Sequence, residues 1–145
     1  MVTYLAGTDG AEASETIATF LNDIAEPGDR VEVVNVLTSS DVDTAEAGEE
    51  ALTAFENSFE VDAELRCRQL NRGRSPAEEM VAVADNVDAD RLVTGFRQHS
   101  RTERIISGSV SQSLIKRVDR PVTLVPLPSY TVVDPEKITS EPTGE

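Results

Sequence analysis

The sequence contains one cysteine, Cys67, one histidine, His99, and no tryptophan. A single cysteine cannot form an intramolecular disulfide, and this composition indicates a reducing cytoplasm. One cysteine and one histidine also cannot provide the usual ligand set of a zinc site, so we predict no metal centre. The sequence has no run of about 18 apolar residues, and its N-terminus lacks a basic segment. We therefore expect neither a membrane helix nor a signal peptide.

Lysine is also scarce, since Lys116 and Lys137 stand against eleven arginines in a chain whose net charge is −14. An acidic surface repels the phosphate backbone, which argues against a nucleic-acid partner. Acidity combined with few lysines favours a surface adapted to a salt-rich cytoplasm over an ordinary acidic protein. Residues 66–120 hold eleven Lys/Arg and seven Asp/Glu, whereas the rest of the chain holds two and twenty. This more basic zone indicates a place for an anion, with ion pairing across the fold as the alternative.

Strand-like and helix-like segments alternate along the chain. Strands are expected over 2–7, 31–37, 63–68, 91–94 and 121–125, separated by helices whose apolar residues recur on one face. The run Ser75-Pro76-Ala77-Glu78 has the pattern of a capping box and predicts a helix start, while the polar residues 38–48 are expected to form a loop. Such alternation predicts an α/β domain with a single open five-stranded parallel sheet and helices on both faces.

The strand over 63–68 alternates Ala63, Leu65 and Cys67 with charged residues, a period typical of a half-exposed edge strand. We therefore predict the strand order 3-2-1-4-5 with this strand at one edge. Cys67 lies on its apolar side and is interpreted as a small core residue rather than a reactive thiol. The strand over 121–125 would form the other edge and is uncharged, which predicts a homodimer through this strand. The alternative is that the tail folds back and covers it.

The connection from Gly95 to Ser109 is longer than an ordinary loop and carries four basic side chains: Arg97, His99, Arg101 and Arg104. It ends at Gly108-Ser109, where a helix is expected to begin. The first N–H groups of a helix lack partners and attract phosphate, so we predict an anion site at this helix start. The alternative is that Ser109 only caps the helix. His99 has no visible nucleophile partner, and we predict no catalytic residue.

These motifs resemble those of the universal stress protein family. Its nucleotide-binding members carry Gly-x2-Gly-x9-Gly-Ser/Thr between the fourth strand and the fourth helix. Here the stretch reads Gly95-x2-Gln98-x9-Gly108-Ser109, followed by Val110-Ser111. Asp9-Gly10 after the first strand also fits the family, and Asn35-Val36 closes the second strand where the family usually has His-Val. The resemblance covers roughly residues 2–126, so we expect one domain over 1–126, related to the adenine nucleotide α-hydrolase-like folds, and an acidic, proline-containing tail over 127–145.

The resemblance implies a role for each matching residue. Asp9 and Val36 would contact the adenine and ribose of a nucleotide. The ribose and phosphates would be held by the residues of the fourth connection and helix start, namely Gly95, Gly108, Ser109, Val110 and Ser111, and we add Arg97 from the basic loop. Gln98 replaces a glycine of the family pattern. Its side chain would either crowd the phosphates, so that no nucleotide binds, or hydrogen-bond to them.

Taken together, these features predict a cytoplasmic stress-response protein that binds ATP or AMP, with or without Mg²⁺, in a regulatory or signalling role. A regulatory dimer that binds protein partners and no nucleotide is the alternative, which Gln98 and the acidic surface favour. An enzyme that hydrolyses ATP is the third possibility. The segment Asp9-Gly10-Ala11-Glu12 lacks the Ser-Gly-Gly-x-Asp-Ser loop of related hydrolases, which makes the enzyme the least favoured of the three hypotheses.

Overall fold

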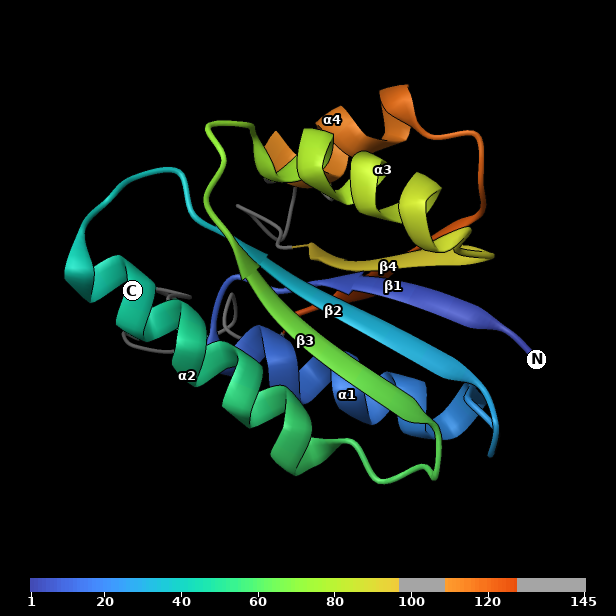
Figure 1. Cartoon of the computed structure of the whole chain (residues 1–145). Coiled ribbons are helices and arrows are strands. Elements are labelled where there is room, and N and C mark those ends of the chain that lie inside the picture. The colour runs from blue at the N-terminus through green and yellow to red at the C-terminus, as the bar shows by residue number, and fades with distance from the viewer. Residues whose placement is uncertain (97–108, 128–145) are drawn as a thin grey trace, which may run out of the picture.

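The computed structural model describes residues 1–96 and 109–127, with side chains in the second range from Gln112 onward. Five parallel strands form one sheet in the order β3-β2-β1-β4-β5 (Figure 1). The strands are β1 (Thr3–Gly7), β2 (Arg30–Val36), β3 (Glu64–Leu70), β4 (Arg91–Phe96) and β5 (Val122–Pro126). The helices are α1 (Ala11–Ile24), α2 (Val42–Ser58), α3 (Pro76–Val87) and α4 (Ser109–Arg117). The predicted fold class and strand order are confirmed, with the charged strand β3 at one edge.

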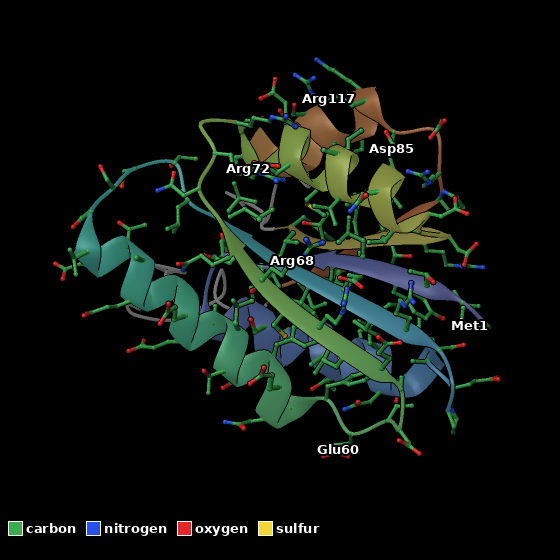
Figure 2. The ribbon with its side chains drawn as sticks, in the orientation of Figure 1. Met1, Glu60, Arg68, Arg72, Asp85 and Arg117 are labelled. Atoms are coloured by element: carbon green, nitrogen blue, oxygen red, sulfur yellow. The ribbon has the colours of Figure 1, made fainter. Side chains whose placement is uncertain are left out.

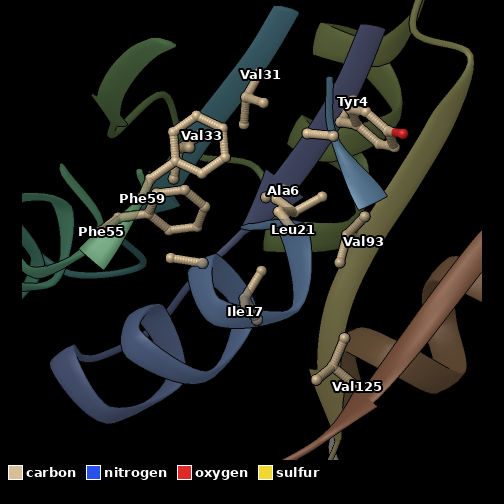
Figure 3. Packing of buried hydrophobic residues seen from close by; sticks show 12 residues of the cluster. Tyr4, Ala6, Ile17, Leu21, Val31, Val33, Phe55, Phe59, Val93 and Val125 are labelled. Atoms are coloured by element: carbon tan, nitrogen blue, oxygen red, sulfur yellow. The ribbon is translucent and has the colours of Figure 1, made fainter. Parts of the chain in front are cut away.

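Two helix layers enclose the sheet, with α1 and α2 on one face and α3 and α4 on the other (Figure 1). The α1–α2 layer buries Ile17, Leu21 and Phe55, which are all 0% exposed, against Val33 and Val93 of the sheet (Figure 3). Full burial of one such side chain contributes about 1.5–3 kcal/mol relative to exposure. This layer therefore contributes much of the hydrophobic stabilisation on its face of the sheet.

The α3–α4 layer packs on the opposite face, where Met80 of α3 and Leu114 of α4 cluster with Leu5 and Leu92 of the sheet. Here α3 comes very close to the central strand, because a Cβ atom built on Gly7 would lie 2.6 Å from the Met80 sulfur. A side chain at position 7 would have to displace Met80. Glycine thus lets α3 pack directly on β1 near its carboxyl end. Among the described residues, no helix has the length and hydropathy needed to cross a bilayer.

Helix α2 begins earlier than the sequence pattern predicts. Residues 38–48 were expected to be a loop, but α2 starts at Val42, and the Asp41 carboxylate accepts a hydrogen bond from the Asp43 N–H at 3.2 Å. The buried positions of α2 before Phe55 are the small residues Gly48 and Ala51. Small residues give almost no hydrophobic periodicity, so the polar exposed residues concealed the first turns of this helix.

The charged side of β3 covers a buried carboxylate on the neighbouring strand. Glu32 in β2 is 1% exposed, and its oxygens lie 3.8 Å from Arg66 Nη1 and 3.7 Å from Arg68 Nη2. Figure 2 shows Arg68 on β3, on the side of the strand that faces away from α2. A buried carboxylate requires compensating charge. The alternating arginines of the edge strand therefore neutralise Glu32 as well as facing solvent.

Candidate functional site

The direction of the chain reverses between β1 and β4, which are neighbours in the sheet. From β1 the chain passes through α1 to β2 on one side, and from β4 it passes through α4 to β5 on the other. In an open parallel sheet the two connections separate at such a switch point and leave a crevice at the carboxyl ends of the strands. The carboxyl ends of β1 and β4 thus define the candidate site.

The turn after β1 consists of Thr8, Asp9 and Gly10 and is fixed on its inner side. The Thr8 N–H donates to the Val34 carbonyl at 3.0 Å. The Thr8 hydroxyl donates to the Gly10 carbonyl at 3.1 Å and lies 2.6 Å from the hydroxyl of Ser14, which is 0% exposed. Asp9 lies between these anchored residues and its side chain is exposed. The turn therefore presents Asp9 outward from a rigid base.

Side-chain amides lie beneath this turn. Asn35, which is 5% exposed, donates from Nδ2 to the Thr8 carbonyl at 3.0 Å. Its Oδ1 accepts from Gln69 Nε2 at 3.2 Å, and the same Gln69 nitrogen donates to the Ala45 carbonyl at 2.9 Å. The sequence analysis identified Asn35 only as part of a family motif and missed Gln69. The signal for Asn35 was a polar residue near the end of the otherwise largely apolar β2, whereas Gln69 lies in the charged edge strand β3, where a polar residue gives no signal.

Val36 ends β2, beside the turn, and is half-buried. It pairs with Leu70 of β3 and packs against the cluster that α3 covers. Its apolar side chain is thus placed at the same edge of the sheet as Asp9.

Gly95 lies inside β4 rather than after it, paired with Val125 of β5. A Cβ atom built on Gly95 would lie 2.7 Å from both methyl carbons of Leu127 and 2.8 Å from its Cγ. Leu127 is 7% exposed, and its N–H donates to the Phe96 carbonyl at 3.0 Å. The close approach to Gly95 is therefore made by Leu127, a residue that the sequence analysis assigned to the tail.

Helix α4 begins at Ser109, on the α3–α4 side of the sheet. Arg97, Gln98 and Gly108 lie outside the described residues, as do the side chains of Ser109, Val110 and Ser111. The remainder of the expected tail, 128–145, lies outside them as well. Of the predicted site residues, the structure therefore brings Asp9, Val36 and Gly95 to one edge of the sheet.

An ion pair between a buried carboxylate and a half-exposed arginine lies beyond the carboxyl end of β3. Glu79 of α3 is 0% exposed, and its two oxygens accept from Arg72 Nη2 at 2.7 Å and Arg72 Nε at 3.0 Å. Hydrogen bonds from Arg72 hold the pKa of the Glu79 carboxyl below its ordinary value of 4.5, although burial acts in the opposite direction. Figure 2 shows Arg72 near the start of α3. The pair fixes the β3–α3 connection, and sequence reasoning did not find it.

Other surfaces of the described residues suit an anionic ligand less well. A groove between α1 and α2 is lined by four glutamates, Glu15, Glu46, Glu49 and Glu50, which repel phosphate. The described residues contain no group of three or more His, Cys, Asp or Glu side chains arranged to hold a metal ion. The switch point between β1 and β4 is thus the better candidate.

A family model built from known proteins matches this chain over residues 3–126, and it describes the universal stress protein family. The chain belongs to the universal stress protein family. The match spans every described strand and helix of this universal stress protein, from β1 to the end of β5. The resemblance inferred from the motifs is therefore confirmed.

Solved structures of universal stress proteins share this fold. A universal stress protein from Archaeoglobus fulgidus is 26% identical, with a TM-score of 0.69 over 86% of this chain and 98% of that chain. The A. fulgidus protein in complex with dAMP is 23% identical, with a TM-score of 0.63 over the same shares. A family member from Arabidopsis thaliana with AMP bound is 14% identical, with a TM-score of 0.58 over 100% of both chains. At the identities of the last two, the likeness shows the fold alone.

A curated relative is also a stress protein. The stress response protein NhaX of Bacillus subtilis (strain 168) is 42% identical over 50 residues. That segment is 34% of this universal stress protein and 30% of NhaX, so the match spans under a third of the relative's length.

Proposed function

We propose that this universal stress protein binds an adenine nucleotide, ATP or AMP, and acts in a cytoplasmic stress response through the bound state rather than through catalysis. The observation that carries the proposal is the switch point between β1 and β4. There the anchored Thr8–Gly10 turn and the end of β4 lie side by side, and the chain from β4 leads to the start of α4. Family members with the same fold are described as complexes with dAMP and AMP, which supports the choice of ligand.

In this proposal Asp9 and Val36 contact the adenine and ribose. Gly95 and Arg97, with Gly108, Ser109, Val110 and Ser111 at the start of α4, hold the ribose and phosphates. The N–H groups of a helix start are suited to phosphate and need no metal ion, although Mg²⁺ would lower the charge of ATP. A nucleotide held here would join the carboxyl ends of β1 and β4 to the start of α4, and a partner would recognise the nucleotide state at this place.

We expect the purified protein, first shown to be free of nucleotide, to bind ATP or AMP in calorimetry at high salt. At a free ligand concentration 100 times Kd, the nucleotide should raise the free energy of unfolding by about 2.7 kcal/mol. Gly108→Val should abolish binding and leave the circular dichroism spectrum unchanged, because a side chain there blocks the approach of phosphate.

Asp9→Ala should weaken binding, whereas Asp62→Ala should not. Both residues are exposed, but Asp62 lies at the amino ends of the strands, so the pair separates a local contact from a change of net charge. If the wild type gives neither heat nor stabilisation at millimolar ATP and AMP, the proposal is wrong. The regulatory dimer without nucleotide then becomes the better function.

We also propose that the protein forms a homodimer through β5. Among the described strands β5 pairs only with β4, so none of them occupies its outer edge. Val122, Thr123 and Leu124 are uncharged and half-buried, and a strand edge without charge invites pairing.

Sedimentation at micromolar protein concentration in high salt should therefore show a dimer for the wild type. Thr123→Lys should shift it to monomer, because a charged residue on an edge strand opposes pairing. Glu64→Lys places lysine on the opposite edge, in β3, and should leave the dimer intact. A wild-type monomer would contradict this interface.

A further inference from the structure

A chain of polar side chains crosses the carboxyl ends of β3, β2 and β1. It starts at the Ala45 carbonyl in α2, passes through Gln69 and Asn35, and reaches the Thr8 carbonyl. From Thr8 it continues through the hydroxyl to Ser14 in α1. We call Gln69, Asn35 and Thr8 the amide relay. It joins both helices of one layer to the turn that presents Asp9.

The relay has a fixed direction. A carbonyl oxygen can only accept, so Asn35 must direct its NH₂ group toward Thr8 and its oxygen toward Gln69. Gln69 must then direct its own NH₂ group toward Asn35 and Ala45. The position of each amide is settled by its neighbour, which leaves one consistent arrangement of donors. A substitution that removes a donor but keeps the shape of the side chain will therefore break a defined link.

Close packing prevents Asn35 from moving away from the turn. A Cβ atom built on Gly48 of α2 would lie 2.1 Å from Asn35 Oδ1 and 2.6 Å from Gln69 Nε2. The backbone of α2 is thus in direct contact with both amides, and only glycine allows this approach. With the backbone of α2 on one side and Thr8 on the other, Asn35 is held in place.

We propose that Asn35 is a positioning residue for the adenine nucleotide. It does not contact the ligand but holds the Thr8 carbonyl, and so sets the place of the neighbouring Asp9. The inference rests on the proposed nucleotide-binding function and adds to it a residue whose role is exerted through the turn. The three groups that hold Asn35, namely the Thr8 carbonyl in the turn after β1, the Gln69 amide of β3 and the Gly48 backbone of α2, are uncharged.

The substitution Asn35→Asp tests this role. At pH 8 the introduced carboxylate can still accept from Gln69 but can no longer donate to Thr8, and it places a negative charge against a carbonyl oxygen. We expect the Kd for AMP to rise about tenfold, because the turn is no longer held where it presents Asp9 to the ligand. This factor corresponds to the free energy of about one net hydrogen bond. As the pH falls toward 5 the buried carboxyl becomes protonated and donates again, since burial favours the neutral form. The ratio of variant to wild-type Kd should then return toward one.

Asn22→Asp is the matched control. Asn22 Nδ2 donates to the Ser58 carbonyl at 2.9 Å, and its Oδ1 accepts from the Glu60 N–H at 2.8 Å. The substitution therefore also removes an amide donor to a backbone carbonyl, here that of Ser58. Ser58 lies at the other end of α2 from Ala45, about 20 Å away at a rise of 1.5 Å per residue. We expect Asn22→Asp to lower stability without changing the Kd for AMP at either pH.

Measuring both variants beside the wild type separates the two hypotheses. If the wild type binds AMP and Asn35→Asp binds it equally well at pH 8, the positioning role is wrong and the proposed function stands. A weaker Kd that does not recover at low pH also contradicts the role. If the wild type binds no adenine nucleotide, both ideas fail. Should Asn35→Asp not fold, Gln69→Glu removes the two donors to Asn35 and Ala45 at a half-buried position. A partial recovery at low pH is then expected, because a protonated carboxyl can donate only one of these two hydrogen bonds.

Discussion

Glu79→Gln is expected to lower the free energy of unfolding by about 2 kcal/mol at pH 7. Glu79 is fully buried and its carboxylate accepts two hydrogen bonds from Arg72, at 2.7 and 3.0 Å. Hydrogen bonds to charged groups contribute about 1.5–3 kcal/mol, and we take the lower part because the Arg72 side chain is half exposed. The amide keeps the shape of the carboxylate but lacks its charge and can accept from Arg72 with one oxygen only.

The pH dependence of this difference is the sharper measurement. The pKa of Glu79 is lowered in the folded protein, chiefly by the hydrogen bonds from Arg72. The stabilisation is therefore complete above the ordinary carboxyl pKa of 4.5 and is lost as the pH falls through the lower folded value. Urea unfolding at a series of pH values should give free energies of unfolding for wild type and variant that converge below that pH, because a protonated Glu79 resembles glutamine. If the difference in free energy of unfolding between wild type and variant stays constant down to pH 3, the charge of the pair contributes nothing to stability.

Asp85→Asn controls for the loss of an ordinary surface pair. Asp85 accepts from Arg120 at 2.9 Å, a distance similar to those between Arg72 and Glu79, but the Asp85 side chain is 66% exposed, whereas Glu79 is buried. Exposed pairs of this kind contribute little, so this variant should change stability much less than Glu79→Gln.

Cys67 is expected to react with iodoacetamide about 50-fold more slowly than a free thiol at pH 8. Burial, and then the charge of Glu56 and a hydrogen bond to it, raise the pKa of the Cys67 thiol from 9.0 to about 12. The thiolate fraction at pH 8 falls about 1,000-fold as a result, and the greater nucleophilicity of a more basic thiolate restores about 20-fold of the rate. Limited access to a half-buried thiol slows the reaction further.

The alkylation rate of folded Cys67 should rise about tenfold per pH unit from pH 7 to pH 10. A thiol with the ordinary pKa levels off near pH 9, which the protein unfolded in guanidinium should show as the internal control. A folded-state rate that also levels off near pH 9 would contradict the raised pKa. It would also weaken the interpretation of Cys67 as a core residue.

The predictability of the fold varied from element to element. The alternation in 63–68 identified β3 as an edge strand, because one charged face is visible in sequence. The buried Glu32 and Glu79 were missed, since the arginines that compensate their charge, Arg66 and Arg68 for Glu32 and Arg72 for Glu79, come from other segments. Such pairs depend on which segments meet in space, and no periodicity within one segment records this.

The site was predictable to a similar degree. The alternation of strands and helices predicts a parallel sheet, whose strands all end on the same side. Asp9, Val36 and Gly95 are therefore expected together at the carboxyl ends of the strands. The relay beneath the turn did not follow, since Asn35, Gln69 and Ala45 come from three elements and meet only once α2 packs on the sheet. The contact of Leu127 with Gly95 was equally hidden, because the acidic, proline-containing composition of residues 127–145 does not indicate that Leu127, the first of them, is buried.

The place of β1 in the middle of the sheet sets an order for events on the ribosome. β2 follows β1 closely, but β4, the other neighbour of β1, ends about 60 residues after β2, roughly 3–12 s later at ~5–20 residues per second. During that interval Leu5 lacks the cover that Leu92 gives it in the finished domain. β1 is thus synthesised first, but it gains its second neighbour in the sheet, β4, only late in synthesis. A nascent chain has no crevice between β1 and β4 to offer a ligand, so a bound nucleotide would mark only those molecules whose synthesis and folding have passed that point.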